Sequence, residues 1–331
     1  MGHYLVTGVA GFIAARVAEM LLEDDHRVTG VDNLNDAYDV RMKEYRLNRL
    51  VGRPGFSFEK LDISDWEGLE ALGKQVYHGS GRAVFDGVIN LAARAGVRQS
   101  VANPWVYFQT NVTGTLNLLE LCRRYEIPKF ILASTSSIYG ANAPLPTPED
   151  YDSNHPLQPY AASKKGAEVL CFSYHYLYGI DVSVFRYFTV YGPAGRPDMV
   201  MFRFTQWIRE ERPVKLNGDG EQSRGFTYVD DIARGTIQGL KPLGYEIINL
   251  GGHETIKINE LIRLMESLIG KSAQVEQRPA HPADMLANWA NVDKAEELLG
   301  WQPRVSLREG VTDLVAWYEA ERSWASQVRT E

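Results

Sequence analysis

The first half of the chain alternates short apolar runs with longer stretches in which apolar residues recur at helical spacing. This alternation is typical of βαβ units, whose strands pair in a parallel sheet. It predicts two long helices, over residues 105–125 and 160–177. It predicts strands at 3–8, 27–32, 56–62, 85–92, 129–134 and 181–187.

The alternation of predicted strands and helices ends after the sixth strand. Residues 189–199 are rich in glycine and proline, which predicts a structured loop. A strand is predicted at 214–218, another at 226–231 that leads into a helix, and a helix over 257–270. Residues 301–321 predict a last helix preceded by a proline turn. Because the chain shows no internal repeat and no low-complexity linker, we expect one α/β body.

Composition excludes several classes of protein. The net charge of −7, without a Lys/Arg cluster, argues against a nucleic-acid surface. No uninterrupted apolar run is long enough to span a membrane, and the N-terminus runs straight into a strand without a secretory signal pattern. Cys122 and Cys171 form no CxxC motif, which suggests reduced thiols of a cytoplasmic protein. The seven histidines show no ligand spacing such as HExxH, so we expect no metal site.

A strand, a tight turn and an amphipathic helix occupy residues 4–23, and Gly8 and Gly11 lie in the turn. Glycines let a backbone approach a pyrophosphate, and a helix N-terminus directs N–H groups at its charge. Asp32 ends the next predicted strand, where a carboxylate binds ribose hydroxyls and repels a 2′-phosphate. The pattern predicts dinucleotide binding with NAD preferred over NADP. The alternative is an ordinary strand-turn-helix corner.

Tyr160 and Lys164 are four residues apart at a predicted helix start, so their side chains are neighbours on one helix face. A nearby ammonium group favours phenolate and lowers the pKa of a tyrosine, which would make a base. Alternatively, both are ordinary solvated helix residues.

With these residues in view, the chain resembles the extended short-chain dehydrogenase/reductases that act on nucleotide sugars, and among them the UDP-glucuronate 4-epimerases. The resemblance covers nearly the whole chain. It rests on eight motifs in the same order: TGVAGFIA, VDNLNDAYDV, NLAARAGVRQS, ASTSSIYG, PYAASKK, FRYFTVYGPAGRPDM, GDGEQSRGFTYVDD and NVDKAEELLGWQP.

The resemblance implies a Rossmann-type doubly wound parallel sheet with a smaller C-terminal substrate-binding region. Residues 1–186 would bind NAD, with a return of the chain at about 225–252, and residues 187–331 would mainly bind the UDP-sugar. By motif position, Thr135, Tyr160 and Lys164 would be catalytic. The residues implied to contact NAD are Gly8, Gly11, Phe12, Ile13, Asp32, Asn33, Asp62, Ile63, Leu91, Ala92, Ala93, Tyr160 and Lys164.

For the sugar, the resemblance places Ser136, Ser137 and Thr189 near the C6 group, and the same loop supplies Arg196. Hydroxyl donors beside a cation suit a carboxylate, which favours UDP-glucuronate. The alternative is that these hydroxyls only satisfy the loop backbone. The UDP would be held by Arg98 and Arg224 near the diphosphate and by Asp284 near the ribose.

The scaffold also carries dehydratases and decarboxylases, so the fold alone does not fix the reaction. Those relatives have acidic residues after the position of Thr135, whereas this chain has Ser136 and Ser137, which are not useful acids at neutral pH. This difference favours epimerisation at C4. The alternatives are a UDP-glucose or UDP-N-acetylglucosamine 4-epimerase and, more remotely, a non-catalytic NAD-binding regulator. The resemblance also implies a homodimer that pairs through the two long helices.

Three residues depart from the family pattern. Ala14 replaces a third glycine, and Asn90 replaces a histidine before LAA. Gly225 stands where an aspartate usually follows the arginine of the SRxFTY motif. We expect Ala14 to tighten the contact between helix and cofactor by one methyl group and the other two to leave the catalytic residues unaffected.

Overall fold

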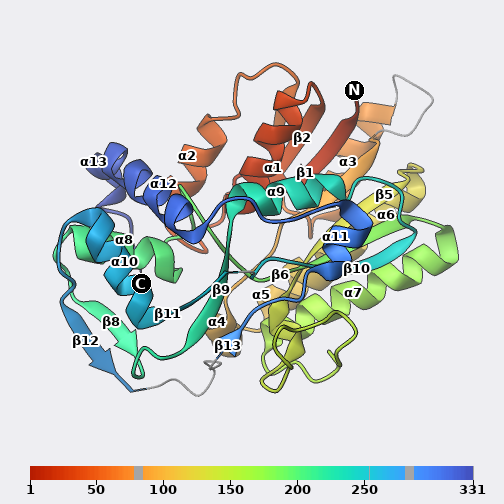
Figure 1. Ribbon diagram of the computed structural model, residues 1–331. Helices are drawn as coiled ribbons and strands as arrows, with labels where there is room; N and C mark the ends of the chain where they lie inside the picture. Colours follow the sequence, from red (N-terminus) through yellow and green to blue (C-terminus); the bar gives the residue numbers. More distant parts are fainter. Residues whose placement is uncertain (78–84, 253, 280–286, 331) are drawn as a thin grey trace.

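The computed structural model describes residues 1–77, 85–252, 254–279 and 287–330, to which all structural statements refer. A wholly parallel sheet lies at its centre, with the strand order β10-β6-β5-β4-β1-β2-β3 (Figure 1). All six strands predicted in the first half are present. The seven strands are β1 (His3–Thr7), β2 (Arg27–Asp32), β3 (Phe56–Lys60), β4 (Gly87–Asn90), β5 (Lys129–Thr135), β6 (Asp181–Tyr187) and β10 (Tyr245–Leu250).

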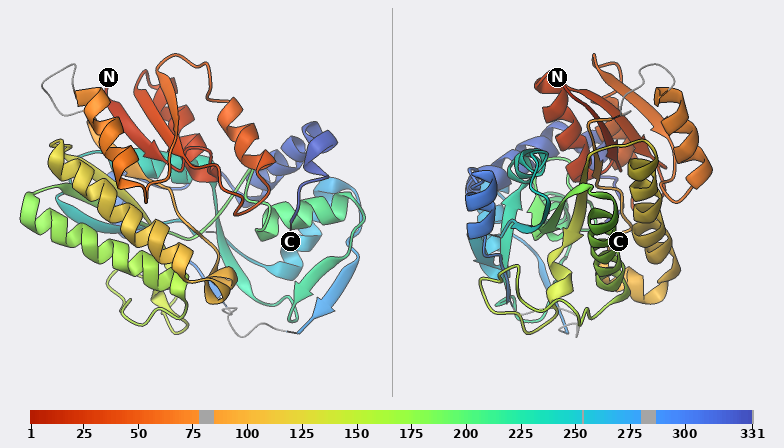
Figure 2. Two further views of the ribbon diagram at one scale, coloured as in Figure 1. Left: turned by 180° about the vertical axis from the view of Figure 1, so that it is seen from behind. Right: turned by 90° about the vertical axis from the view of Figure 1, so that its right-hand side faces the viewer.

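Helices cover both faces of this sheet, which confirms the predicted α/β class of fold (Figures 1 and 2). In β5, Phe130 and Leu132 pack into one apolar cluster, whereas Ile131 and Ala133 pack into the other. A strand buried on both faces explains the continuous apolar run in the sequence. One face is covered by α1 (Phe12–Glu23), α9 (Val229–Gln238) and α11 (Asp293–Leu299), and the other by α3 (Trp66–Tyr77), α6 (Gly114–Arg124) and α7 (Pro159–Tyr178).

The C-terminal elements gather beside the large sheet around a third apolar cluster (Figure 1). A small sheet contains β7 (Thr189–Tyr191), β9 (Ser223–Tyr228), β11 (Glu254–Lys257) and β13 (Ala287–Asn288), and β8 (Val214–Asn217) pairs with β12 (Val275–Arg278). The helices here are α8 (Val200–Arg209), α10 (Ile258–Ile269), α12 (Leu307–Ala320) and α13 (Arg322–Ala325). Three short helices elsewhere are α2 (Arg41–Asn48), α4 (Val97–Ala102) and α5 (Trp105–Phe108).

Four segments differ from the predictions. The strand expected over 226–231 is the end of β9, and its last three residues begin α9, because the chain turns into the helix after Tyr228. The helix expected over 105–125 is α5 and α6 joined by a π-helical turn, Gln109–Thr113. The loop expected over 189–199 begins as β7, because these residues find a parallel partner in the distant strand β9. The helix α12 is followed by the single turn α13, so it is not the last helix.

The chain returns to the large sheet late in the sequence. Helix α9 packs on α1, and β10 pairs with β6 at the sheet edge. Residues Ser223–Tyr228, by contrast, form β9 of the small sheet. Helix α11 also packs against α9 and β10, which brings residues 293–299 back as well.

The strand order reverses between β1 and β4, which are neighbours in the sheet. In open α/β sheets, ligands bind outside the carboxyl ends of the strands at such a point. The turn after β1, the loop after β4 and the end of β5 all lie along this edge. The predicted cofactor and catalytic residues therefore converge there.

Candidate active site

Two glycines bring the turn after β1 into close contact with neighbouring backbone. Gly8 has φ +68°, and a Cβ on it would lie 2.7 Å from the Cα of Ala92. The N–H of Gly11 donates to the Gly8 carbonyl at 2.7 Å, and a Cβ on Gly11 would lie 2.8 Å from the same oxygen. Gly11 is also the N-cap of α1, so the first N–H groups of the helix face outward without a side chain over them. This cradle fits a dinucleotide pyrophosphate.

The carboxylate of Asp32 lies against the glycine turn. It accepts hydrogen bonds from the N–H groups of Ala10 at 3.2 Å and Leu34 at 2.8 Å. The Nζ of Lys43, a buried residue of α2, lies 3.3 Å from the same carboxylate. The sequence did not indicate Lys43, because a single lysine in a helical pattern is expected to be exposed to solvent.

A second carboxylate, Asp62, lies next to the end of β2. It accepts from Asn33 Nδ2 at 2.6 Å and from the N–H and Oγ of Ser64, both at 2.8 Å. Burial raises the pKa of Asp62, but these hydrogen bonds outweigh burial and leave the pKa lowered. Asp62 is therefore an anion at neutral pH, suited to accept hydrogen bonds from a ligand.

The remaining predicted cofactor residues lie along the same edge. Phe12 and Ile13 begin α1, and Ile63 directly follows Asp62. Leu91, Ala92 and Ala93 follow β4 and are half-buried. The structure thus brings the predicted cofactor residues together.

Thr135 is the last residue of β5, as its motif predicts. Its Oγ1 accepts from the N–H of Ser137 at 3.2 Å and donates to Ser137 Oγ at 3.2 Å. The neighbouring Ser136 is buried, and its Oγ accepts from Asn288 Nδ2 at 3.2 Å. The motif analysis did not include Asn288, whose contact arises only because β13 reaches this loop.

Tyr160 and Lys164 lie in the first two turns of α7, which begins with Pro159 after the N-cap Gln158. Lys164 is buried, and its Nζ donates to the backbone carbonyl of Ala133 in β5 at 2.8 Å. Burial lowers the pKa of Lys164 to about 8, although the Glu168 carboxylate raises it. The lysine is thus held by the central strand.

The protein's own groups do not activate Tyr160 as the sequence suggested. Burial raises the pKa of Tyr160, and it outweighs a hydrogen bond with Thr135 and the positive charge of Arg196, which both lower the pKa. Tyr160 is therefore a phenol at neutral pH in this environment. The expectation that the adjacent lysine produces a net lowering was wrong, because it neglected the desolvation of a half-buried phenol.

Tyr107 and Asn111 position the site, and sequence reasoning missed both. The Tyr107 ring packs edge-on to Tyr160, with 6.1 Å between centroids, and its hydroxyl donates to the carbonyl of Gly96 at 2.9 Å. In the π-helical turn, Asn111 Nδ2 donates to Ser163 Oγ of α7 at 2.9 Å and to the carbonyl of Arg94 at 3.0 Å. Turns of this kind recur at functional sites, but both residues fit an ordinary helical pattern.

Arg196 lies close enough to Tyr160 to affect its pKa, but its guanidinium is already engaged. Nε and Nη2 donate to the carboxylate of Asp198 at 3.0 and 2.6 Å, a side-on bidentate pair that occupies one side of the guanidinium. Thr189 begins β7 and is half-buried, opposite Phe226 of β9. A substrate carboxylate would therefore meet an arginine whose orientation is fixed by Asp198.

The predicted UDP-binding residues are more dispersed. Arg98 is exposed in α4. Arg224 lies in β9, paired in the ladder with Asn288, the residue that contacts Ser136. Asp284 lies outside the described residues.

The three departures from the family pattern now have structural explanations. Ala14 is buried in the apolar cluster under α1, so its methyl packs into the core instead of tightening the cofactor contact as expected. Asn90 is also buried, accepting from Thr7 Oγ1 at 2.8 Å and donating to Thr115 Oγ1 at 3.1 Å. A Cβ on Gly225 would lie 2.6 Å from the Cα of Gly252, so the close approach of these two backbone segments excludes a side chain.

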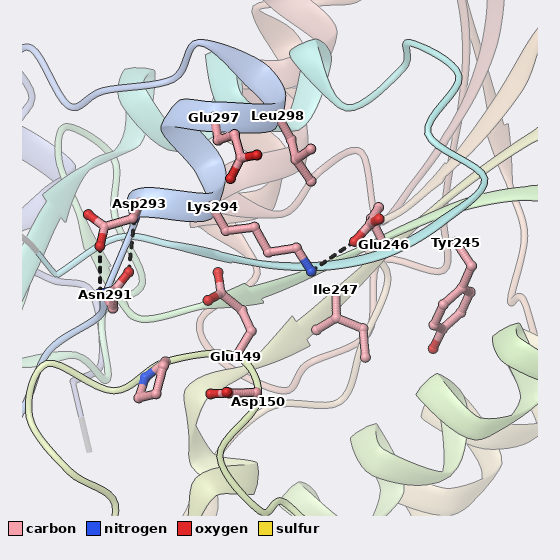
Figure 3. Close-up of a pocket in the computed structure, with 11 residues that line it drawn as sticks. Glu149, Asp150, Tyr245, Glu246, Ile247, Asn291, Asp293, Lys294, Glu297 and Leu298 are labelled. Atoms are coloured by element: carbon pink, nitrogen blue, oxygen red, sulfur yellow. Dashed lines mark hydrogen bonds and ion pairs between the residues drawn. The ribbon is translucent and has the colours of Figure 1, made fainter.

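A pocket of about 730 Å³ lies elsewhere, between the 148–150 loop, β10 and α11 (Figure 3). Its walls carry Glu149, Asp150, Asp293 and Glu297, and its lysine, Lys294, pairs with Glu246 at 2.8 Å. Carboxylates repel a diphosphate, so this pocket does not suit UDP.

Two features are absent from the described residues. None of the helices there combines the length and apolar character needed to cross a bilayer. Those residues also contain no group of three or more His, Cys, Asp or Glu side chains arranged to hold a metal ion.

The sequence and the fold both match known proteins. Residues 4–251 match the NAD dependent epimerase/dehydratase family. The chain is 56% identical over 318 residues to a UDP-glucuronate 4-epimerase of Thermodesulfobacterium geofontis, covering 96% of both chains.

Solved structures agree. The crystal structure of a UDP-glucuronic acid 4-epimerase from Bacillus cereus, in complex with UDP-glucuronic acid and NAD, superposes with a TM-score of 0.88 at 35% identity, covering 96% of this chain and 99% of that one. A UDP-glucose 4-epimerase from Thermotoga maritima, with UDP-glucose, gives 0.87 at 32% identity, covering 97% and 99%. By sequence and by fold, this chain belongs to the NAD dependent epimerase/dehydratase family.

Proposed function

We propose that this protein is an NAD-dependent UDP-glucuronate 4-epimerase that interconverts UDP-glucuronate and UDP-galacturonate. The observation that carries the proposal is the 56% identity, over nearly the whole of both chains, to a UDP-glucuronate 4-epimerase. Thr135 ends β5, Lys164 contacts Ala133 of the same strand, and Tyr160 lies one helical turn from Lys164, at the edge of the sheet that also carries the glycine turn, which supports the proposal. Because Tyr160 and Lys164 are both present, a non-catalytic NAD-binding regulator is not favoured.

Each of the three residues has a role in the proposed mechanism. Tyr160 takes the proton of the C4 hydroxyl, and Thr135 donates a hydrogen bond to the same oxygen. NAD, held by the glycine turn, Asp32 and Asp62, would accept hydride from C4, return it to the other face and contribute a positive charge. Lys164, fixed on the Ala133 carbonyl one helical turn from Tyr160, is proposed to add a second cation that favours the phenolate. The 4-keto sugar turns over between the two transfers.

The sugar is assigned by the groups around C6. Ser136, Ser137, Thr189 and Arg196 are proposed to hold the C6 carboxylate, and Arg98, Arg224 and Asp284 the UDP. A UDP-glucose 4-epimerase superposes almost equally well, so the fold does not choose between acidic and neutral sugars.

A panel of UDP-sugars tests the proposal. The purified protein is incubated with UDP-glucuronate, UDP-glucose and UDP-N-acetylglucosamine without added cofactor, and the products are separated. We expect UDP-glucuronate to give UDP-galacturonate fastest. Faster conversion of a neutral sugar would assign the protein to the alternative class.

Asp32 should control the choice of cofactor. We expect Asp32→Ala to reduce the preference for NAD over NADP by about tenfold or more, because Lys43 would then be free to pair with a 2′-phosphate. Calorimetry on cofactor-stripped protein gives both affinities, and Asp36→Ala, an exposed carboxylate of the same loop, is the control. An unchanged ratio in Asp32→Ala would remove Asp32 from cofactor discrimination.

We also propose a homodimer that pairs through α7 and the α5–α6 segment. Val169, Phe172 and Tyr176 form an exposed apolar stripe on α7, and Trp105, 82% exposed, begins α5. Apolar stripes of this kind mark association surfaces. Two buried thiols, Cys122 and Cys171, support a cytoplasmic location.

A charge on the α7 stripe should separate the dimer. We expect Val169→Asp combined with Tyr176→Asp to give a monomer by light scattering at a concentration where the wild type is a dimer, because a carboxylate would be buried unpaired. Val275→Asp, an exposed valine on β12, is the control and should remain a dimer. A monomeric wild type, or a dimer that persists in the double variant, would contradict this interface.

The domain division remains a proposal of the same kind. Residues 1–186, with α9 and β10 from the return at 225–252, would carry NAD. The remainder of 187–331 would mainly carry the UDP-sugar.

A further inference from the structure

Arg46 is a buried cation of α2, 3% exposed, whose hydrogen bonds within the described residues go to neutral oxygens. Nε donates to the carbonyl of Ala194 at 2.9 Å, and Nη2 donates to that of Gly195 at 3.0 Å. Nη1 donates to the carbonyl of Ala10 at 3.2 Å and to the Tyr38 hydroxyl at 2.8 Å. A buried charge is costly unless its hydrogen bonds are satisfied, so this arrangement points to a specific role.

The acceptors of Arg46 come from two segments that both belong to the proposed active site. Ala10 lies within the glycine turn between Gly8 and Gly11. Ala194 and Gly195 immediately precede Arg196. Ala194 has φ +53°, a conformation that a non-glycine residue adopts at a cost, and Arg46 holds its carbonyl in place.

Tyr38 links Arg46 to Arg196 a second time. Its ring lies 5.5 Å from the guanidinium of Arg46 and 6.0 Å from that of Arg196. The guanidinium of Arg196 in turn lies near enough to Tyr160 to lower the pKa of the phenol. Contacts therefore run from the cofactor turn through Arg46 and Tyr38 to Arg196, and the charge of Arg196 reaches the proposed base.

We propose that Arg46 is a positioning residue that fixes the 192–196 loop on the cofactor turn and thereby aims Arg196 at the C6 carboxylate. The part of this inference that concerns the carboxylate rests on the proposed function. A lysine cannot replace the arginine, since one ammonium group does not span three carbonyl oxygens in the geometry of a guanidinium fork. Arg46 does not contact the reacting atoms.

A double-mutant cycle tests the link between the two arginines. We expect Arg46→Lys to lower kcat/KM for UDP-glucuronate by about tenfold in the wild-type background, but by less than about twofold in an Arg196→Ala background, because residues that act through one another are not additive. Arg49→Lys is the matched control: Arg49 is the C-cap of α2, is exposed and pairs with Glu19. It should leave kcat/KM unchanged in both backgrounds.

Amide hydrogen exchange across residues 189–199 gives a readout that needs no substrate. We expect Arg46→Lys to speed exchange there by about tenfold or more at a temperature well below its melting point, and to leave exchange in β5 unchanged. Tyr38→Phe, which removes one acceptor and keeps the ring, should show a smaller effect in the same peptides and remains informative if Arg46→Lys does not fold.

The outcomes test the proposed epimerase function and the positioning role of Arg46 separately. If the wild type does not epimerise UDP-glucuronate, the proposed function fails, but the exchange result still decides whether Arg46 holds the loop. Unchanged exchange across 189–199, or equal losses of kcat/KM in both backgrounds, would overturn the role of Arg46. A fall in melting temperature with unchanged kinetics and exchange would show a purely structural arginine.

Discussion

Tyr160→Phe should lower turnover of UDP-glucuronate by roughly two decades or more, the scale of general acid–base catalysis, while the UDP-sugar still binds. The variant removes one oxygen and keeps the ring, which packs against Tyr107. Binding is measured by calorimetry and turnover by separation of the two sugars. Tyr174→Phe is the control, because Tyr174 lies on the same helix but donates to Glu120.

The dependence of the rate on pH distinguishes the base from its neighbours. Burial raises the pKa of Tyr160 and the positive charge of bound NAD would lower it, so kcat/KM should climb as the pH rises through the resulting pKa. Lys164→Met removes a cation that favours phenolate, which raises the pKa of Tyr160 further. The rise of kcat/KM with pH should therefore occur at higher pH in this variant, and the rate at neutral pH should fall. Near-normal turnover in Tyr160→Phe would remove this residue from the mechanism.

Thr189→Ala and Arg196→Ala should release a decarboxylated product. Oxidation at C4 of a glucuronate creates a ketone β to the C6 carboxylate. Such an acid loses CO₂ when its C5–C6 bond aligns with the π system of the ketone, because the bonding electrons then enter an enolate. An epimerase must hold this bond near the plane of the carbonyl. Thr189 and Arg196 are the proposed restraints, and Asp198 keeps the guanidinium of Arg196 oriented.

The loss of one restraint should be measurable. A hydrogen bond to a charged group contributes ~1.5–3 kcal/mol, so its removal should change the partition between the two fates by about tenfold or more. We expect a UDP-4-keto-pentose, CO₂ and reduced nicotinamide that absorbs near ~340 nm, since the hydride taken from C4 is no longer returned. Thr312→Ala, a hydroxyl on the outer face of α12, is the control. If both variants only slow down, with no CO₂, the assignment of the carboxylate site is wrong.

Local patterns were sufficient to predict the cofactor turn and the spacing of Tyr160 and Lys164, whereas their catalytic role and that of Thr135 came from the family resemblance. One βαβ unit contains the two glycines that permit the tight turn, Gly8 and Gly11, and the carboxylate expected at the ribose, Asp32. Tyr160 and Lys164 share a helix face, so their proximity follows from helical spacing alone. The sheet was predictable because a strand such as β5, buried on both faces, must be apolar at every position.

Structural features that depend on contacts between distant segments could not be predicted from the sequence. Thr189–Tyr191 forms a strand only because β9 lies beside it, and Lys43 and Arg46 are buried only because α2 packs between the cofactor turn and the C-terminal region. The sequence also could not predict how desolvation and favourable interactions combine to set the pKa of Tyr160. There the desolvation cost of the folded environment outweighs the hydrogen bond of Thr135 and the charge of Arg196.

The transfer of hydride from C4 and back to C4 of the same sugar is the central claim. UDP-glucuronate carrying deuterium at C4 is incubated with the wild-type protein in ordinary water, without added cofactor, and the product is examined by mass spectrometry and NMR. The account predicts UDP-galacturonate that retains the deuterium at C4. Loss of the deuterium to water, or the absence of UDP-galacturonate, would contradict it.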